Sequence, residues 1–172
     1  PTTLQFGPDG RLYVGERYGQ INIYTVSRTM PGEYTVTDTE VLNQVYNKPN
    51  RTDDGALDPI TVGRQMTGIL VVGTAQNPVI YAASSDPRVA VGVDSGLDTN
   101  SGIITRLTWN GTSWDELDIV RGLPRCEENH ASNGMALDPL TNTLYLGQGG
   151  HTNMGAPSNN FGFTPEYALS AA

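Results

Sequence analysis

One local pattern occurs three times along this chain, and it limits the folds that the chain can adopt. Each copy is an apolar strand, a turn rich in Gly, Pro, Asp or Asn, and a second strand centred on a tyrosine. The copies are TLQFGPDGRLYVGE (residues 3–16), ILVVGTAQNPVIYAAS (69–84) and GMALDPLTNTLYLGQG (134–149). Their tyrosines, Tyr13, Tyr81 and Tyr145, follow one another at intervals of 68 and 64 residues. A period of that length, with a hairpin in each unit, predicts large propeller blades, because solenoid repeats are shorter.

The segments between these copies supply further strands. Residues 19–26 alternate apolar and polar positions with the period of two that a half-buried strand shows. Residues 33–42 are expected to form an outer strand. Residues 102–120 give the clearest hairpin, with Asn110 and Gly111 at its turn, since this pair tolerates the positive φ of a tight turn. We therefore predict an all-β fold with four strands in each blade.

The repeat arithmetic predicts a partial β-propeller. The chain holds about 2.5 four-stranded units, with approximate boundaries at residues 1–48, 49–124 and 125–172. A closed six-bladed ring with ~65 residues per blade needs ~390 residues, and this chain has 172. We expect a single incomplete domain that continues beyond both termini.

Charge and composition exclude several classes of function. The formal net charge of −8 makes nucleic acid an unfavourable partner, because an acidic surface repels phosphates. No apolar run approaches the ~18 residues of a membrane helix, so no membrane span is expected in this segment. Cys126 is the single cysteine, which rules out an intrachain disulfide.

The first candidate for chemistry is His130, which precedes the strand pair of the third unit. A neutral imidazole on the rim of a β-protein can accept a proton near pH 7. Gln65 lies before the first strand of the second unit, in the place that His130 occupies in the third, and Asn129 adjoins His130. Polar side chains at matching strand starts can converge on one ligand. The alternative stays open that all three only bond loop backbone groups.

Further candidates follow the third hairpin, where Gln148 and His151 lie in the glycine-rich run GQGGHTN. Glycine allows the backbone to approach a ligand closely, although it would equally serve a tight turn. The two histidines lack a carboxylate pattern that would complete a site, so no metal ligands are predicted. Two long polar segments, residues 46–59 and 84–102, are loops of the kind that often have a functional role.

The runs FGPDGRLYVGE, RQMTGILV and RGLPRCEENHASNGMALDPLTNTLYLGQGG together resemble the glucose/sorbosone dehydrogenase family. That family includes soluble quinoprotein aldose dehydrogenases, which are six-bladed propellers that use pyrroloquinoline quinone (PQQ) and Ca²⁺. It also includes non-catalytic relatives such as the hedgehog-interacting proteins. The tail GGHTNMGAPSNNF is similar to versions in large secreted bacterial proteins, which implies an extracellular or periplasmic location.

The resemblance implies a role for each candidate residue. His130 matches the general base that takes the proton of the anomeric hydroxyl while hydride passes from C1 of the sugar to C5 of PQQ. Gln65 matches a glutamine that lines the sugar and quinone pocket. Asn129 and Gln148 stand where the family typically has aspartates, and His151 lies in a loop near the same pocket. The basic residues and Ca²⁺ ligands that hold PQQ belong to later blades.

Two functions remain open from the sequence. One is PQQ-dependent oxidation of an aldose sugar, with an external electron acceptor as the second partner. The other is a non-catalytic extracellular module that binds carbohydrate or protein. The residues His130 and Gln65 favour the enzyme, whereas the two amides in place of carboxylates favour the binding module.

Overall fold

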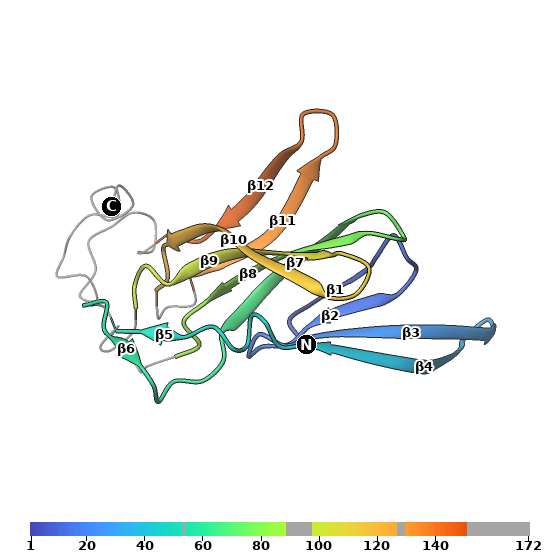
Figure 1. Cartoon of the computed structure of the whole chain (residues 1–172), viewed down its shortest axis with the longest axis horizontal. Coiled ribbons are helices and arrows are strands. Elements are labelled where there is room, and N and C mark those ends of the chain that lie inside the picture. The colour runs from blue at the N-terminus through green and yellow to red at the C-terminus, as the bar shows by residue number, and fades with distance from the viewer. Residues whose placement is uncertain (53, 89–97, 127–129, 151–172) are drawn as a thin grey trace.

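The computed structural model describes residues 1–52, 54–88, 98–126 and 130–150, and every regular element in that part is a β-strand (Figure 1). The prediction of an all-β fold is therefore confirmed. The strands form two four-stranded antiparallel sheets and two two-stranded sheets. No helix able to span a membrane is present among the described residues.

The first sheet is an antiparallel meander in which each strand pairs with the next along the chain. Its strands are β1 (Thr3–Phe6), β2 (Leu12–Gly15), β3 (Ile21–Met30) and β4 (Glu33–Leu42). A short hairpin of β5 (Asn50–Arg51) and β6 (Leu57–Asp58) follows it. The sequence placed β3 and β4 correctly, but it gave no sign of this small hairpin inside the polar segment 46–59.

The second sheet repeats the same meander. Its strands are β7 (Gln65–Gly73), β8 (Pro78–Ser85), β9 (Gly102–Trp109) and β10 (Trp114–Leu123). The predicted turn at Asn110 and Gly111 joins β9 to β10, and Gly111 has a φ of 100°, a value that L-residues rarely adopt. Trp109 and Trp114 face each other across this hairpin with ring centroids 5.6 Å apart.

A third unit is present as the hairpin of β11 (Ser132–Asp138) and β12 (Thr143–Gln148). Figure 1 shows the first sheet in blue, the second in green to yellow and this hairpin in orange, arranged one after another across the molecule. Each of these three units lies inside one of the intervals predicted from the repeat. Tyr13, Tyr81 and Tyr145 all lie on the second strand of their unit, in β2, β8 and β12.

The core fills the space between the first two sheets. The first sheet and the segment after it contribute one set of buried apolar side chains, and the facing side of the second sheet contributes another. The first set is Tyr13, Ile21, Ile23, Leu42 and Val45; the second is Met66, Ile69, Val71, Ile80, Ala82, Leu107 and Trp114. Full burial of a large apolar side chain stabilises a fold by roughly 1.5–3 kcal/mol, so this interface holds the two sheets together.

The first strands of the three units lie next to one another. The Thr2 hydroxyl donates to the Met66 carbonyl (2.7 Å), and the Gln5 amide bonds both main-chain groups of Val71 (2.8 and 2.9 Å). Thr67 in turn donates through its hydroxyl to the Ser132 carbonyl. The order of these contacts means that β1 and β7 run in the same direction, so their starting residues lie at one end of the molecule.

Candidate functional site

Several buried polar groups lie at the end of the second sheet where β7 begins. Gln65 is the first residue of the strand and pairs with Ser85, while Met66 pairs with Ser84. Both serines are fully buried. The Gln65 Oε1 atom and both serine hydroxyls have no hydrogen-bond partner in the described part of the chain. Because buried polar atoms are nearly always hydrogen-bonded, each of these atoms is expected to bond a water, a ligand or a group outside the described residues. Ser85 pairs with Gln65, whereas the Ser84 side chain points to the other face of the sheet.

His130 lies just before β11 and is held through its backbone. Its carbonyl accepts a hydrogen bond from the Cys126 amide (2.8 Å), and the next residue, Ala131, accepts one from Gly149 (3.0 Å). Gly149 lies close enough that a Cβ there would be 3.0 Å from the His130 Cα and Cβ atoms. The backbone of His130 is thus fixed in position, whereas the buried Nδ1 of its half-buried side chain has no partner among the described residues.

The strands carry Gln65 and His130 to the same end of the molecule. Thr67 bonds Ser132, and a Cβ added at Gly68 would be 2.2 Å from the Asn133 carbonyl oxygen. Gln65 and His130 each precede that matched pair by two residues. Their correspondence in sequence is therefore a correspondence in space, on the first strands of adjacent units. Each has one buried atom, Gln65 Oε1 and His130 Nδ1, without a hydrogen-bond partner in the described part of the chain.

Gln148 has a structural role in this part of the site. Its Oε1 accepts from the Ser132 hydroxyl (2.7 Å), and its Nε2 donates to the carbonyls of Pro124 (2.9 Å) and Gly149 (2.6 Å). The amide thereby joins the end of β12 to the start of β11 and to the segment that follows β10. The other two predicted pocket residues, Asn129 and His151, lie outside the described residues.

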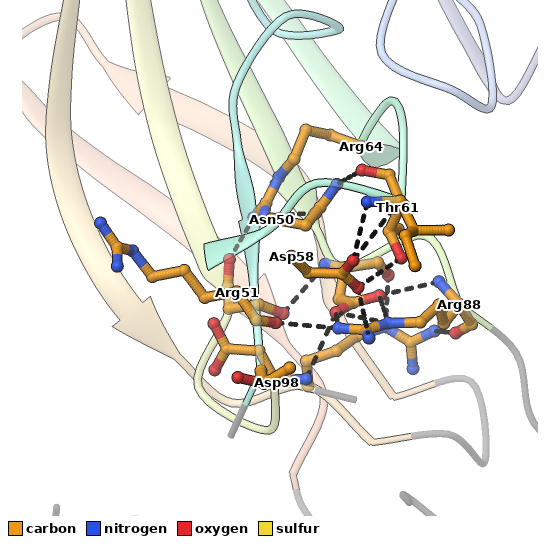
Figure 2. A network of polar contacts seen from close by, with 12 residues as sticks. Asn50, Arg51, Asp58, Thr61, Arg64, Arg88 and Asp98 are labelled. Atoms are coloured by element: carbon orange, nitrogen blue, oxygen red, sulfur yellow. Dashed lines mark hydrogen bonds and ion pairs between the residues drawn. The ribbon is translucent and has the colours of Figure 1, made fainter. Parts of the chain in front are cut away.

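A polar network on the same end was not predicted from the sequence (Figure 2). Asp86, which is fully buried, accepts hydrogen bonds from the Arg88 backbone and guanidinium (both 2.9 Å to Oδ1). Arg88 also donates to Asp58 (2.8 Å) and to the Arg51 carbonyl (2.8 Å). The network joins the β5–β6 hairpin to the segment after β8. Both segments were predicted from the sequence as loops of the kind that often have a functional role. The ion pair between Arg88 and Asp58 that joins them was not predicted.

The charged groups of the network stabilise one another. Hydrogen bonds from the Thr61 hydroxyl and the Ile60 amide, with a smaller contribution from Arg88, hold the pKa of Asp58 below its ordinary value. The hydrogen bond to Asp86 raises the pKa of Arg88, although burial opposes this. Both groups are therefore ionised at neutral pH. The two loops are held by full charges, which are stronger hydrogen-bonding groups than neutral ones.

Neither a known protein family, nor a curated protein, nor a solved structure matches this chain. The resemblance in its motifs therefore stays a prediction. In the described part of the chain, no group of three or more His, Cys, Asp or Glu side chains is arranged to hold a metal ion.

Proposed function

We propose that the three units are consecutive blades of a β-propeller whose central pocket opens at Gln65 and His130. In this proposal the protein oxidises an aldose sugar with PQQ as cofactor, outside the cytoplasm, and passes electrons to an external acceptor. The adjacency and common direction of the first strands support the propeller. The resemblance to glucose/sorbosone dehydrogenases supplies the reaction.

The proposal rests mainly on the buried Nδ1 of His130 and the Oε1 of Gln65, which lie at the same end and have no hydrogen-bond partner among the described residues. Oxidation of an aldose to its lactone removes a hydride from C1 and a proton from the hydroxyl on C1. His130 would take that proton, because a neutral imidazole is a base near pH 7. Gln65 would accept a hydrogen bond from a second sugar hydroxyl and so orient the ring. Bound PQQ supplies the acceptor for the hydride.

The described residues fit the sugar better than they fit the cofactor. Arg17 is exposed at this end, where its carbonyl accepts from the Met66 amide (3.1 Å), but the resemblance implies that the basic residues that hold PQQ belong to later blades. No Ca²⁺ ligand set is present among the described residues. The proposal therefore requires the cofactor's ion to be held by groups outside the part of the chain described.

A second function, a binding module without turnover, is favoured by two observations. Asn129 precedes His130 in the sequence, where the resemblance implies an aspartate, and an amide cannot stabilise an imidazolium by charge. The amide of Gln148 is fully used in joining strands. In such a module the groups of Gln65 and His130 would bond carbohydrate hydroxyls, or polar groups of a protein, without proton transfer.

Titration of the protein with PQQ and Ca²⁺, followed by dye reduction on a panel of aldoses, tests the choice. His130→Gln should leave PQQ binding intact and lower kcat by roughly 10²–10⁴-fold, as expected for loss of a general base. Arg28→Gln, which alters an exposed residue near the tip of the β3–β4 hairpin, is the control and should leave kcat unchanged. Asn129→Asp should raise kcat by restoring a charge beside the imidazole. A protein that binds no PQQ at micromolar concentration would reject the enzyme and favour the binding module.

A further inference from the structure

A second candidate site surrounds Arg64, a buried arginine that no carboxylate in the described part of the chain contacts directly. Arg64 is 2% exposed. Its Nη1 donates to the Asn50 Oδ1 (2.9 Å), and its Nη2 donates to the Ser101 carbonyl. Its Nε has no partner in the described part of the chain. Buried arginines usually pair with a carboxylate, because desolvating a lone charge is costly. Arg64 has only neutral acceptors.

The side chain that orients Arg64 is itself fixed. Asn50 is 1% exposed, and its Nδ2 donates to the carbonyls of Thr61 (2.9 Å) and Gly63 (2.8 Å). Both amide hydrogens are therefore used, and Oδ1 must face Arg64 (Figure 2). The position of the guanidinium is thus set by the fold before any ligand arrives, which lowers the entropy cost of binding.

A cavity of about 260 Å³ adjoins this arginine. Arg51, Arg64 and Arg121 line it together with Asp98 and the amide side chain of Asn100. Three arginines and one carboxylate line it, with Asp118 paired to Arg121, although the chain as a whole has a net charge of −8. The volume corresponds to roughly nine water molecules, taking ~30 Å³ for each. It admits a small organic molecule as well as a bare inorganic ion.

Burial lowers the pKa of Arg64 to about 10, and the carboxylates of Asp86 and Asp98 partly offset this. Arg64 is therefore charged at neutral pH. The same burial strengthens its attraction for an anion, because the low local dielectric weakens screening. Arg121 is a different kind of group: its side chain is 67% exposed and pairs with Asp118, so it can turn toward an incoming anion at little cost.

We propose that the cavity between the β5–β6 hairpin and the ends of β9 and β10 binds a small molecule through its oxyanion, a carboxylate or a phosphate group. The Nε–H of Arg64 donates to the oxyanion from the buried side, and Arg51 and Arg121 close around it from the exposed side. Neither Gln65 nor His130 lines this cavity. Anion binding in this cavity does not require PQQ. The proposal is therefore independent of the proposed dehydrogenase activity.

Nuclear magnetic resonance of the arginine Nε–H groups tests the site directly. Inorganic phosphate and malonate are titrated separately at constant ionic strength. We expect the Arg64 Nε–H resonance to shift saturably with at least one of them, with a dissociation constant of about 1 mM or tighter. The ion that binds more tightly tells phosphate-bearing ligands from carboxylates. If neither anion gives a saturable shift up to about 50 mM, some fifty times that constant, the proposal is wrong.

Matched variants distinguish specific anion binding in the cavity from nonspecific attraction to positive charge. Arg51→Gln and Arg121→Gln should each weaken binding by about 2- to 5-fold, the size expected of partly exposed ion pairs. Arg28→Gln makes the same change in net charge on an exposed strand away from the cavity and should leave binding unchanged. Equal weakening by all three would overturn the proposal, because it would show attraction to net charge alone. None of these substitutions removes the buried Arg64, so folding is retained and is checked by circular dichroism.

Discussion

Tyr13 and Tyr145 occupy the same position in two copies of one local unit, yet their surroundings are opposite. Each lies on the second strand of its unit, and each pairs with the first strand, Tyr13 with Gln5 and Tyr145 with Ala136. Tyr13 is fully buried, because the second sheet covers its face of the first. Tyr145 is 60% exposed. Tyr81, on the face of the second sheet toward the two-stranded third unit, is intermediate.

The interface between the first and second sheets also contains a chain of polar side chains that joins the two sheets. The Tyr13 hydroxyl donates to Asp9 (2.8 Å), and Asp9 accepts from Arg11 (2.6 Å). Arg11 in turn donates to Glu40 (2.8 Å), whose other oxygen accepts from the Trp114 indole of the second sheet (2.7 Å). Three neighbouring residues of the first hairpin thus connect through Glu40 to Trp114, 74 residues further along the chain in the second sheet.

Among the described residues, the side-chain hydrogen bonds of the corresponding turn of the third unit stay within that turn. Asp138 accepts from the Leu140 amide (2.9 Å) and the Thr141 hydroxyl (2.8 Å), both within its own hairpin. The repeated sequence therefore specifies a hairpin with a tyrosine on its second strand. Whether that tyrosine is buried depends on the sheet that packs against it. Substitutions at equivalent positions should therefore have unequal effects.

The largest difference is expected at the two tyrosines. Tyr13→Ala removes a buried ring and should lower the free energy of unfolding by about 3–5 kcal/mol. Tyr145→Ala is the matched control and should change it by less than about 0.5 kcal/mol, as exposed substitutions do. Urea unfolding followed by fluorescence measures both. Equal losses at the two positions would mean that Tyr145 is covered in the intact protein.

A smaller effect is expected where the third unit meets the second. A Cβ at Gly68 would lie 2.2 Å from the Asn133 carbonyl oxygen, a backbone atom that cannot move aside without shifting β11. Gly68→Ala should cost about 1–3 kcal/mol and speed hydrogen exchange in β11. Gly134→Ala, in β11 itself, has no atom within 4 Å of the new methyl group and should leave exchange unchanged. Unaltered protection in Gly68→Ala would show that β11 does not pack on β7.

The smallest effect concerns pH. Burial raises the pKa of Asp9, but hydrogen bonds from Arg11 and Tyr13 outweigh it and hold the pKa below its ordinary value. A carboxyl whose pKa is lowered on folding stabilises the fold above its unfolded pKa of about 3.9, and this stabilisation is lost as the pH falls through the folded value. Asp9→Asn should therefore cost about 1–2 kcal/mol at pH 6–7 and progressively less below about pH 4.

Asp138→Asn is the comparison for that pH series. Hydrogen bonds from Thr141 and Leu140 also lower the pKa of Asp138, but the group is exposed and bonds only its own turn. Its substitution should give the same sign of pH dependence with a smaller amplitude. Urea midpoints between pH 2.5 and 7 are measured for both variants and for the unsubstituted protein. A stability difference between Asp9→Asn and the unsubstituted protein that does not change with pH would contradict the bridge between the sheets.

Much of the candidate site could be predicted from local pattern. Gln65 and His130 stand at matching places in their units, and the strands bring them to one end, because strand direction follows from the repeat. The role of Gln148 could not be predicted in this way. Two of its partners, Ser132 and Pro124, lie 16 and 24 residues away in sequence. No local sequence pattern distinguishes an amide that joins strands from one that binds a ligand.

The buried charged side chains were the part of the structure that the sequence predicted least well. Arg64 and Asp86 read as ordinary loop residues, since a charged side chain in a polar segment is normally exposed. Only the folding of two long segments onto each other places Asn50 and Ser101 against Arg64. The cavity beside it depends on groups from four separate stretches of the chain.

The sequence by itself determined the strands, their turns and the tyrosine of each unit, because alternation and turn residues act over a few neighbouring positions. The tertiary structure alone decided which tyrosine is buried, which carboxylate bridges two sheets and which arginine is left with an unpaired donor. Burial, desolvation and charge pairing are properties of a site surrounded on all sides, and those surroundings come from residues distant in the chain.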